Sequence, residues 1–192
     1  DLPWPAIPAL VEGERLILMT LHRRENFGEP IRTILASIRR FAKEHPEARI
    51  LYPVHPNPNV KGPAEEILGG IPNVNMVEPL DYPTLIGALK RAYLVFTDSG
   101  GLQEEAPALG KPVLVFREVT ERPEAVDAGG AMLVGSDPGA FTSVVNQVWN
   151  DPLAYARVAQ VRFPYGDGTS GMRIAEILAC EARGLAVQGQ CL

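Results

Sequence analysis

The chain has 192 residues, 46% of them hydrophobic and 21% charged, with a formal net charge of -5 at pH 7. This length fits one domain with at most an appendage, and the composition excludes a disordered chain. The acidic balance argues against general nucleic-acid binding, which needs a basic face, and no apolar run approaches the ~20 residues of a membrane span. Cys180 and Cys191 are too few for a disulfide framework, so a cytoplasmic location is expected.

Apolar runs of strand length alternate with helical patterns along the chain. The runs predict strands at 15–21, 49–54, 73–79, 93–98, 112–117 and 131–135. The intervening and following patterns predict helices at 30–45, 62–70, 81–92, 101–110, 122–129 and 137–150. The strands are apolar throughout rather than alternating, as is typical of a parallel sheet covered on both faces. The sequence therefore predicts an α/β fold with a doubly wound, Rossmann-like parallel sheet.

Two further helical stretches, near 151–161 and 170–183, have no strand between them and are expected to pack outside the sheet. We therefore expect a lead-in segment at 1–14, a Rossmann-like domain at 15–150, and C-terminal helices with a tail at 151–192. Ligands of such sheets bind at the carboxyl ends of the strands, near the point where the strand order reverses. Each junction from a strand to a helix is thus a candidate site.

The junction "DSGG" follows the fourth predicted strand. Gly100 and Gly101 would let a ligand approach the backbone, and Ser99 offers a hydroxyl, beside helix amides suited to a phosphate. A tight turn with an N-cap explains the same residues without a ligand. Of Glu104 and Glu105, we expect one to face solvent and the other to accept hydrogen bonds from a ribose. An acidic residue early in a helix is also simply stabilising, so this alternative stays open.

Histidines and arginines gather at other strand ends. "LHRREN" places His22 beside two arginines, which can bind phosphate or carboxylate, although the sequence does not indicate which arginine faces the crevice. "VHPNP" holds His55 between prolines, where structural and ligand-binding roles are equally open. His45 lies near the end of a predicted helix and is expected to be structural. In "TERPEAV", Arg122 precedes a proline expected to open a helix, which would fix its backbone beside the crevice.

Five segments together resemble one family. "TLHRREN", "YPVHPNPNV", "TDSGGLQEEAPALGKPVLV", "TERPEAV" and "PYGDG" have the order and spacing seen in the non-hydrolysing UDP-N-acetylglucosamine 2-epimerases, from about Arg15 to about Leu178. The chain resembles the C-terminal half of these GT-B-type enzymes, which have two Rossmann-like domains. The resemblance implies an isomerase that interconverts UDP-N-acetylglucosamine and UDP-N-acetylmannosamine by eliminating UDP and adding it back.

The same resemblance assigns the nucleotide ligands. It implies that Ser99, Gly100 and Gly101 seat the diphosphate of UDP. It implies that Glu105 binds the ribose and that Arg122 binds the diphosphate. The domain at 15–150 would therefore bind UDP.

Five further residues receive roles from the resemblance. It implies that His22 lies beside the diphosphate and helps UDP leave, as the candidate catalytic residue. Arg23 and His55 are candidates for contacts with an allosteric UDP-N-acetylglucosamine. Leu80 and Leu85 are candidates for the uracil pocket, where some relatives carry a glutamine and a phenylalanine.

The expected partners are UDP and UDP-N-acetylhexosamine, with no nucleic acid, membrane, metal or other cofactor. The resemblance also implies a role in cell-surface polysaccharide biosynthesis and a homodimer at full length. Because the N-terminal domain of the family supplies the acids thought to act at C2, we expect this chain to bind UDP weakly without epimerising. The alternatives left open are a GT-B glycosyltransferase, a hydrolysing UDP-N-acetylglucosamine 2-epimerase and a non-catalytic UDP-binding module.

Overall fold

The structure is a computed structural model that describes residues 9–160 and 164–182. The chain divides into two compact units, unit 1 at Asp1–Arg162 and unit 2 at Phe163–Leu192. Within the described part of unit 1, six strands form one parallel sheet in the order β3-β2-β1-β4-β5-β6. The strands are β1 (Arg15–Thr20), β2 (Ala48–Pro53), β3 (Val74–Val77), β4 (Leu94–Thr97), β5 (Val113–Val115) and β6 (Ala131–Leu133). The predicted α/β class with a doubly wound parallel sheet is confirmed.

Helices follow the strands, as predicted. They are α1 (Glu29–Glu44), α2 (Pro58–Leu68), α3 (Tyr82–Arg91), α4 (Gly100–Ala108), α5 (Pro123–Asp127), α6 (Pro138–Asn150), α7 (Pro152–Val158) and α8 (Ser170–Ala182), with a 3-10 turn η1 (Arg24–Asn26) after β1. The prediction for α2 is wrong at its start, which lies at Pro58 rather than residue 62. The side chain of Asn57 accepts a hydrogen bond from the amide of Asn59 at 2.9 Å, and Pro58 suits the first turn.

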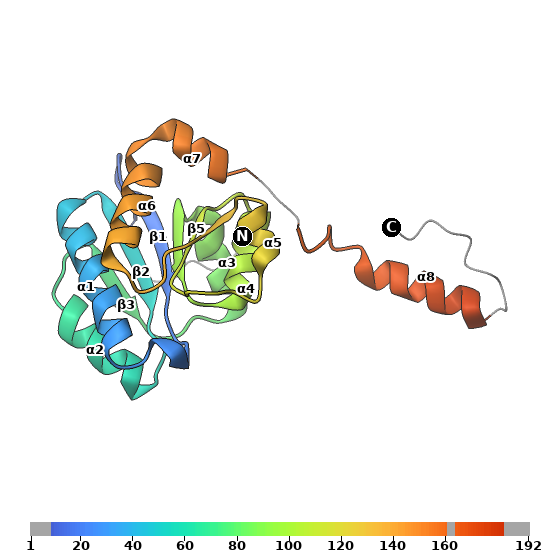
Figure 1. Cartoon of the computed structure of the whole chain (residues 1–192), viewed down its shortest axis with the longest axis horizontal. Coiled ribbons are helices and arrows are strands. Elements are labelled where there is room, and N and C mark those ends of the chain that lie inside the picture. Colours follow the sequence, from blue (N-terminus) through green and yellow to red (C-terminus); the bar gives the residue numbers. More distant parts are fainter. Residues whose placement is uncertain (1–8, 161–163, 183–192) are drawn as a thin grey trace. The chain divides into compact units, whose positions relative to one another are not determined.

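Helices cover both faces of the sheet in unit 1. Figure 1 shows α1, α2 and α6 on one face and α3, α4 and α5 on the other. On α1, Ile31, Ile34, Leu35 and Ile38 recur at helical spacing and are at most 1% exposed. The interior residues of β1 are buried on both faces, which explains why its sequence is an unbroken apolar run.

Aromatic side chains close the core near α6 and α7. The guanidinium of Arg15 lies 3.7 Å from the ring centre of Trp149, whose indole nitrogen donates to Glu47 at 2.9 Å. The ring of Tyr155 on α7 stacks on Tyr93 with centres 3.9 Å apart. These contacts hold α7 against the body of unit 1.

Unit 2 contains α8 and the turn before it. The side chain of Asp167 accepts a hydrogen bond from the amide of Thr169 at 3.0 Å, just before α8 begins. Three large apolar side chains on α8 are exposed: Met172, Ile174 and Leu178. Cys180 on α8 is a free thiol, and Cys191 lies outside the described residues.

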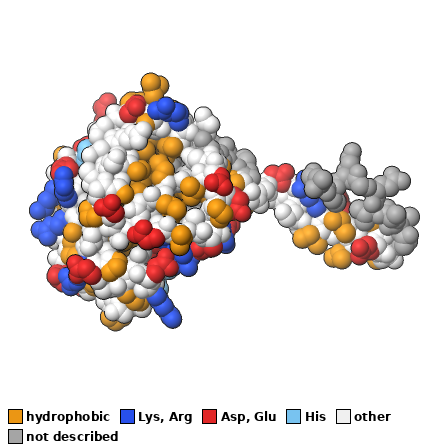
Figure 2. All heavy atoms as spheres, in the orientation of Figure 1, with side chains coloured by type: hydrophobic (Ala, Val, Ile, Leu, Met, Phe, Trp, Pro, Cys, Tyr) orange, Lys and Arg blue, Asp and Glu red, His pale blue; other side chains and the backbone are white. Residues whose placement is uncertain are grey.

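The distribution of charge on the surface and the length of the helices are relevant to the expected partners. On the face of unit 1 drawn in Figure 2, acidic and apolar side chains intermingle, and basic side chains lie toward its margins. No helix in the described part of the chain is long and apolar enough to cross a membrane. The domain boundaries at 14/15 and 150/151 stay a prediction, since parts of the lead-in and the tail lie outside the described residues.

Candidate functional site

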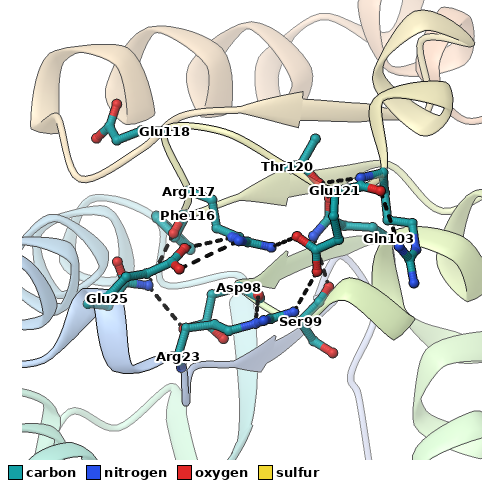
Figure 3. A network of polar contacts seen from close by, with 12 residues as sticks. Arg23, Glu25, Asp98, Ser99, Gln103, Phe116, Arg117, Glu118, Thr120 and Glu121 are labelled. Carbon is teal, nitrogen blue, oxygen red and sulfur yellow. Dashed lines mark hydrogen bonds and ion pairs between the residues drawn. The ribbon is translucent and has the colours of Figure 1, made fainter.

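The strand order reverses between β1 and β4, so connections leave these neighbouring strands toward opposite faces of the sheet. In doubly wound folds a ligand crevice opens at the carboxyl ends of two such strands. Three segments meet there: His22–Asn26 after β1, Asp98–Gly101 after β4, and Arg117–Arg122 after β5 (Figure 3). We call these three segments the strand-end cluster.

The buried carboxylate of Asp98 joins the first two segments. It accepts hydrogen bonds from the backbone amides of His22 at 3.0 Å and Arg23 at 2.9 Å. The side-chain amide of Asn26 also donates to it at 3.0 Å, and to the carbonyl of Phe116 at 3.1 Å. Asp98 is 0% exposed, and these donors compensate for the loss of its hydration. It therefore fixes the loop that carries His22 and Arg23.

His22 forms a dyad with the same carboxylate. Its Nδ1 lies 3.2 Å from Oδ1 of Asp98, while its side chain is 37% exposed. A carboxylate at Nδ1 keeps the proton on that nitrogen and leaves Nε2 as the nitrogen available to a ligand. The ring of His55 stacks near that of His22, with centres 6.0 Å apart, so the structure brings these two predicted residues together.

The first turn of α4 is closely packed by charged side chains. Ser99 is the N-cap residue of the helix, as the turn-and-cap alternative expects, but its side chain makes no capping hydrogen bond. A Cβ atom on Gly100 would lie 2.8 Å from Oε1 of Glu121 and 3.2 Å from Nη2 of Arg23. One on Gly101 would lie 3.9 Å from its nearest neighbour. The missing side chain of Gly100 thus lets the Glu121 and Arg23 side chains approach the helix closely, whereas no side chain approaches Gly101 as closely.

Ion pairs connect the loop after β5 to this first turn. Oε1 of Glu121 accepts a hydrogen bond from Nη2 of Arg23 at 2.7 Å, and its other oxygen pairs with Arg117. Arg117, with a side chain only 10% exposed, also donates to Glu25 at 2.7 Å. Hydrogen bonding to its own backbone amide and pairing with Arg117 lower the pKa of Glu121 to about 2.

A buried glutamine ties this loop to α4. Gln103 is 0% exposed, and its amide nitrogen donates to the carbonyl of Ser99 at 3.1 Å. Its oxygen accepts from the hydroxyl of Thr120 at 2.6 Å, and that hydroxyl accepts from the amide of Arg122 at 3.0 Å. Sequence reasoning missed Gln103 because a glutamine beside two glutamates suggests an exposed helix face.

The two glutamates of α4 each have a partner. Glu104 pairs with Nε of Arg122, which stands before Pro123 at the start of α5 as predicted. Glu105 accepts a hydrogen bond from the hydroxyl of Tyr82 at 3.3 Å, and burial raises its pKa. Both glutamates are intermediate in exposure, and the side chain of Glu104, paired with Arg122 at the protein surface, is 36% exposed. The expectation that one glutamate faces solvent and the other accepts from a ribose stays a prediction.

The segment expected to hold uracil begins α3. Leu80 and Leu85 are half-buried, and Tyr82 between them is 62% exposed. The hydrogen bond from Tyr82 to Glu105 places this segment beside α4. No role was assigned to Tyr82 from the sequence, although an aromatic residue between the two predicted uracil contacts could have indicated a further ligand contact.

The cluster has the chemistry of an anion site. Arg23 lies beside Gly100 in the first turn of α4 and pairs with Glu121. Arg117 and Arg122 belong to the loop after β5 and pair with Glu25 and Glu104, respectively. The amide ends and positive dipole of a helix favour an anion at the same place. Among the residues that the structure describes, no group of three or more His, Cys, Asp or Glu side chains could hold a metal ion.

Comparisons with known proteins agree on one family. Residues 4–179 match the family model described as UDP-N-acetylglucosamine 2-epimerase. The UDP-N-acetylglucosamine 2-epimerase of Yersinia pestis is 46% identical over 166 residues, which are 86% of this chain and 44% of that relative. The solved UDP-GlcNAc 2-epimerase from Neisseria meningitidis, bound to UDP-GlcNAc, is 42% identical with a TM-score of 0.87, over 91% of this chain and 47% of that one.

A second solved relative is similar to the chain at lower sequence identity. The UDP-GlcNAc 2-epimerase of Methanocaldococcus jannaschii, in complex with UDP-GlcNAc and UDP, is 31% identical with a TM-score of 0.73. The match covers 86% of this chain and 45% of that one. The chain therefore spans about half the length of the relatives that it matches.

Proposed function

Since this chain belongs to the UDP-N-acetylglucosamine 2-epimerase family, we propose that it is the nucleotide-binding half of a GT-B-type isomerase. The isomerase interconverts UDP-N-acetylglucosamine and UDP-N-acetylmannosamine. The observation that carries this proposal is the family match over residues 4–179, which includes every residue of the strand-end cluster. The Neisseria meningitidis relative bound to UDP-GlcNAc supports the choice of ligand.

The diphosphate is proposed to bind at the first turn of α4, the diphosphate seat formed by Ser99, Gly100 and Gly101. Ser99 does not cap this helix with its side chain, and Gly100 has no Cβ atom to narrow the approach. Helix amides and guanidinium groups are the donors that phosphate oxygens favour. Arg122, now paired with Glu104, exchanges that partner for the diphosphate.

The nucleoside is proposed to extend from that seat along α4 toward α3. Glu105 lies one turn into α4 and accepts the ribose hydroxyls in place of the hydroxyl of Tyr82. The half-buried Leu80 and Leu85 supply apolar contacts for uracil. A half-buried carboxylate with one weak partner is well suited to take up two ribose donors.

His22 is proposed as the catalytic residue of this half. In the elimination, C2 of the sugar loses its proton and the C1–O bond to the diphosphate breaks, giving 2-acetamidoglucal and UDP. Re-addition reverses both steps with the proton returning on the other face of C2, so no electrons are gained or lost. In its imidazolium form, which carries a proton on each ring nitrogen, His22 donates from Nε2 to the leaving phosphate oxygen, while Asp98 accepts from Nδ1. We expect the general base that removes the C2 proton to come from the half of the full-length relatives that this chain does not match.

The remaining roles follow from family membership. We propose that Arg23 and His55 contact a second, activating UDP-N-acetylglucosamine next to the substrate, since the His55 ring lies near that of His22 and the Arg23 guanidinium lies beside Gly100 at the diphosphate seat. We propose a cytoplasmic homodimer at full length that serves cell-surface polysaccharide biosynthesis. The chain alone is expected to bind UDP without turnover.

Calorimetric titration with UDP and with uridine tests the nucleotide site. Arg122→Ala should weaken binding of UDP far more than binding of uridine, because uridine lacks the diphosphate. Glu105→Ala is the matched variant and should weaken both ligands by about 1.5–3 kcal/mol, since it removes charge-assisted hydrogen bonds to the ribose.

The same titrations can refute the proposal. If the unchanged chain binds no UDP, the proposed nucleotide site is wrong. If Arg122→Ala weakens UDP and uridine equally, Arg122 is not a diphosphate ligand. Deuterium appearing at C2 of UDP-N-acetylglucosamine in D2O with this chain alone would contradict its expected inactivity.

A further inference from the structure

We propose that Glu121 is an internal counter-anion of the diphosphate seat, which a bound nucleoside diphosphate must displace. The carboxylate lies beside Gly100 at the seat and thereby sets the selectivity of the seat between ligands with and without phosphate. This inference rests on the proposed function, because it assumes that a nucleoside diphosphate binds at the first turn of α4.

The position of the carboxylate is the first argument. Oε1 of Glu121 lies 2.8 Å from the point where a Cβ atom of Gly100 would stand. The carboxylate thus packs directly against the first residue of α4, where the helix dipole favours negative charge. A phosphate oxygen seeking the same helix end would meet this carboxylate, and two such anions cannot share the place without strong repulsion.

The guanidinium of Arg23, which pairs with this carboxylate, is held in place by Asp98. Arg23 donates from its backbone amide to the Asp98 carboxylate at 2.9 Å and from Nε to the Asp98 carbonyl at 3.2 Å. Its Nη2 then meets Glu121 at 2.7 Å and lies 3.2 Å from the Cβ position of Gly100. When Glu121 leaves, the guanidinium of Arg23 stays at the seat and is ready for another anion.

The surroundings allow Glu121 to leave at low cost. Its side chain is 40% exposed, so the carboxylate can turn into water. On either side of it, the backbone amide of Arg122 donates to the side-chain hydroxyl of Thr120, and that hydroxyl donates to Gln103, so the loop itself need not move. The poorly exposed Arg117 keeps Glu25 as a partner after Glu121 departs. Displacement therefore leaves no buried charge without a partner among these groups.

Calorimetry on Glu121→Gln tests the proposal. The variant should bind UDP about two- to fivefold more tightly than the unchanged chain, the range expected when a partly exposed ion pair no longer competes. Its affinity for uridine should be unchanged. Glu66→Gln is the matched control, because Glu66 on α2 pairs with Arg32 on α1, outside the strand-end cluster, and should leave UDP affinity unchanged.

A double variant identifies the cation involved. In an Arg23→Gln background, UDP should bind more weakly, and Glu121→Gln should give a smaller gain, because the part of its effect that acts through Arg23 is lost and only the relief of direct repulsion remains. A gain of the same size in both backgrounds would show that Arg23 is not the cation involved and would overturn that part of the proposal. Weaker or unchanged UDP binding by Glu121→Gln, or an equal gain from Glu66→Gln, would overturn the proposal as a whole.

An NMR titration of the unchanged chain tests the proposal without depending on whether a variant folds. With carbon-13 in the glutamate carboxyl groups, the resonance of Glu121 should shift on addition of UDP and stay in place on addition of uridine. If UDP binds but the Glu121 resonance does not shift, the proposal that Glu121 is a counter-anion is overturned. Absence of any UDP binding overturns the proposed function itself, so the two failures can be told apart.

Discussion

At the scale of single residues, Asp98 organises the site through contacts that are distant in sequence. A buried carboxylate is costly unless hydrogen bonds replace its water, and here two backbone amides and the side chain of Asn26 do so. Its remaining interaction is with Nδ1 of His22. The same group therefore positions the loop after β1 and selects which nitrogen of His22 is free.

The protonation site of His22 tests this view. In the neutral imidazole, we expect the proton on Nδ1, because a carboxylate oxygen lies 3.2 Å away. Asp98→Asn should move the proton to Nε2, because an amide can turn its NH2 group toward Nδ1. Nitrogen-15 spectra of the histidine side chains report the tautomer directly, and His55 serves as the internal reference. A proton on Nε2 in the unchanged chain would contradict the dyad.

Some of these residues could be predicted from the sequence, and others could not. His22, Gly100 and Arg122 stand in motifs at predicted strand ends, and in the structure they follow the carboxyl ends of β1, β4 and β5. The roles of Asp98 and Glu121 depend on partners 76 and 98 positions away, at His22 and Arg23. Such pairings arise only when the strands are ordered, so no local pattern indicates them.

At the scale of elements, α4 is a poor helix by composition. It spans nine residues, begins with two glycines and includes Pro107. Glycine lowers helix propensity by about 1 kcal/mol per residue, so tertiary packing must stabilise this element. The buried Leu102, Gln103 and Ala106 provide that packing. Gly100 is thus explained by the approach of other groups rather than by helix formation, whereas Gly101 has ordinary space around its Cβ position.

Replacing each glycine separates these effects. Gly100→Ala should leave the free energy of unfolding within about 1 kcal/mol, because the new methyl meets only the mobile ends of Glu121 and Arg23. The methyl narrows the seat, so UDP affinity should fall by about tenfold, or about 1.4 kcal/mol. Gly101→Ala, whose methyl has ordinary space, should reduce affinity less. UDP binding by Gly100→Ala equal to that of the unchanged chain would contradict the seat.

At the scale of the whole molecule, sequence periodicity predicted the class of fold but not the order of strands. Apolar runs such as β1 indicate burial on both faces, and the alternation with helices indicates parallel strands. Which strands are neighbours depends on long-range pairing, such as that of Ile17 with Leu94. That pairing decides where the order reverses, and so it decides where the cluster forms.

Stability at acid pH depends on the same network. The pKa of Glu121 is lowered from 4.5 to about 2 in the folded chain. A lowered pKa stabilises the folded state above about pH 4.5, and this contribution is lost as the pH falls from 4.5 toward 2. Glu121→Gln should therefore flatten the fall in the free energy of unfolding over this range, measured by urea denaturation. Equal slopes in both proteins would show that Glu121 is not stabilised by its partners.

The most direct test of the account is a crystal structure of this chain with UDP. We expect the diphosphate at the first turn of α4, the ribose hydroxyls on Glu105, and the Glu121 carboxylate turned away from Arg23. A well-ordered UDP bound away from the carboxyl ends of β1 and β4 would contradict the central claim that this strand-end cluster is a nucleoside diphosphate site.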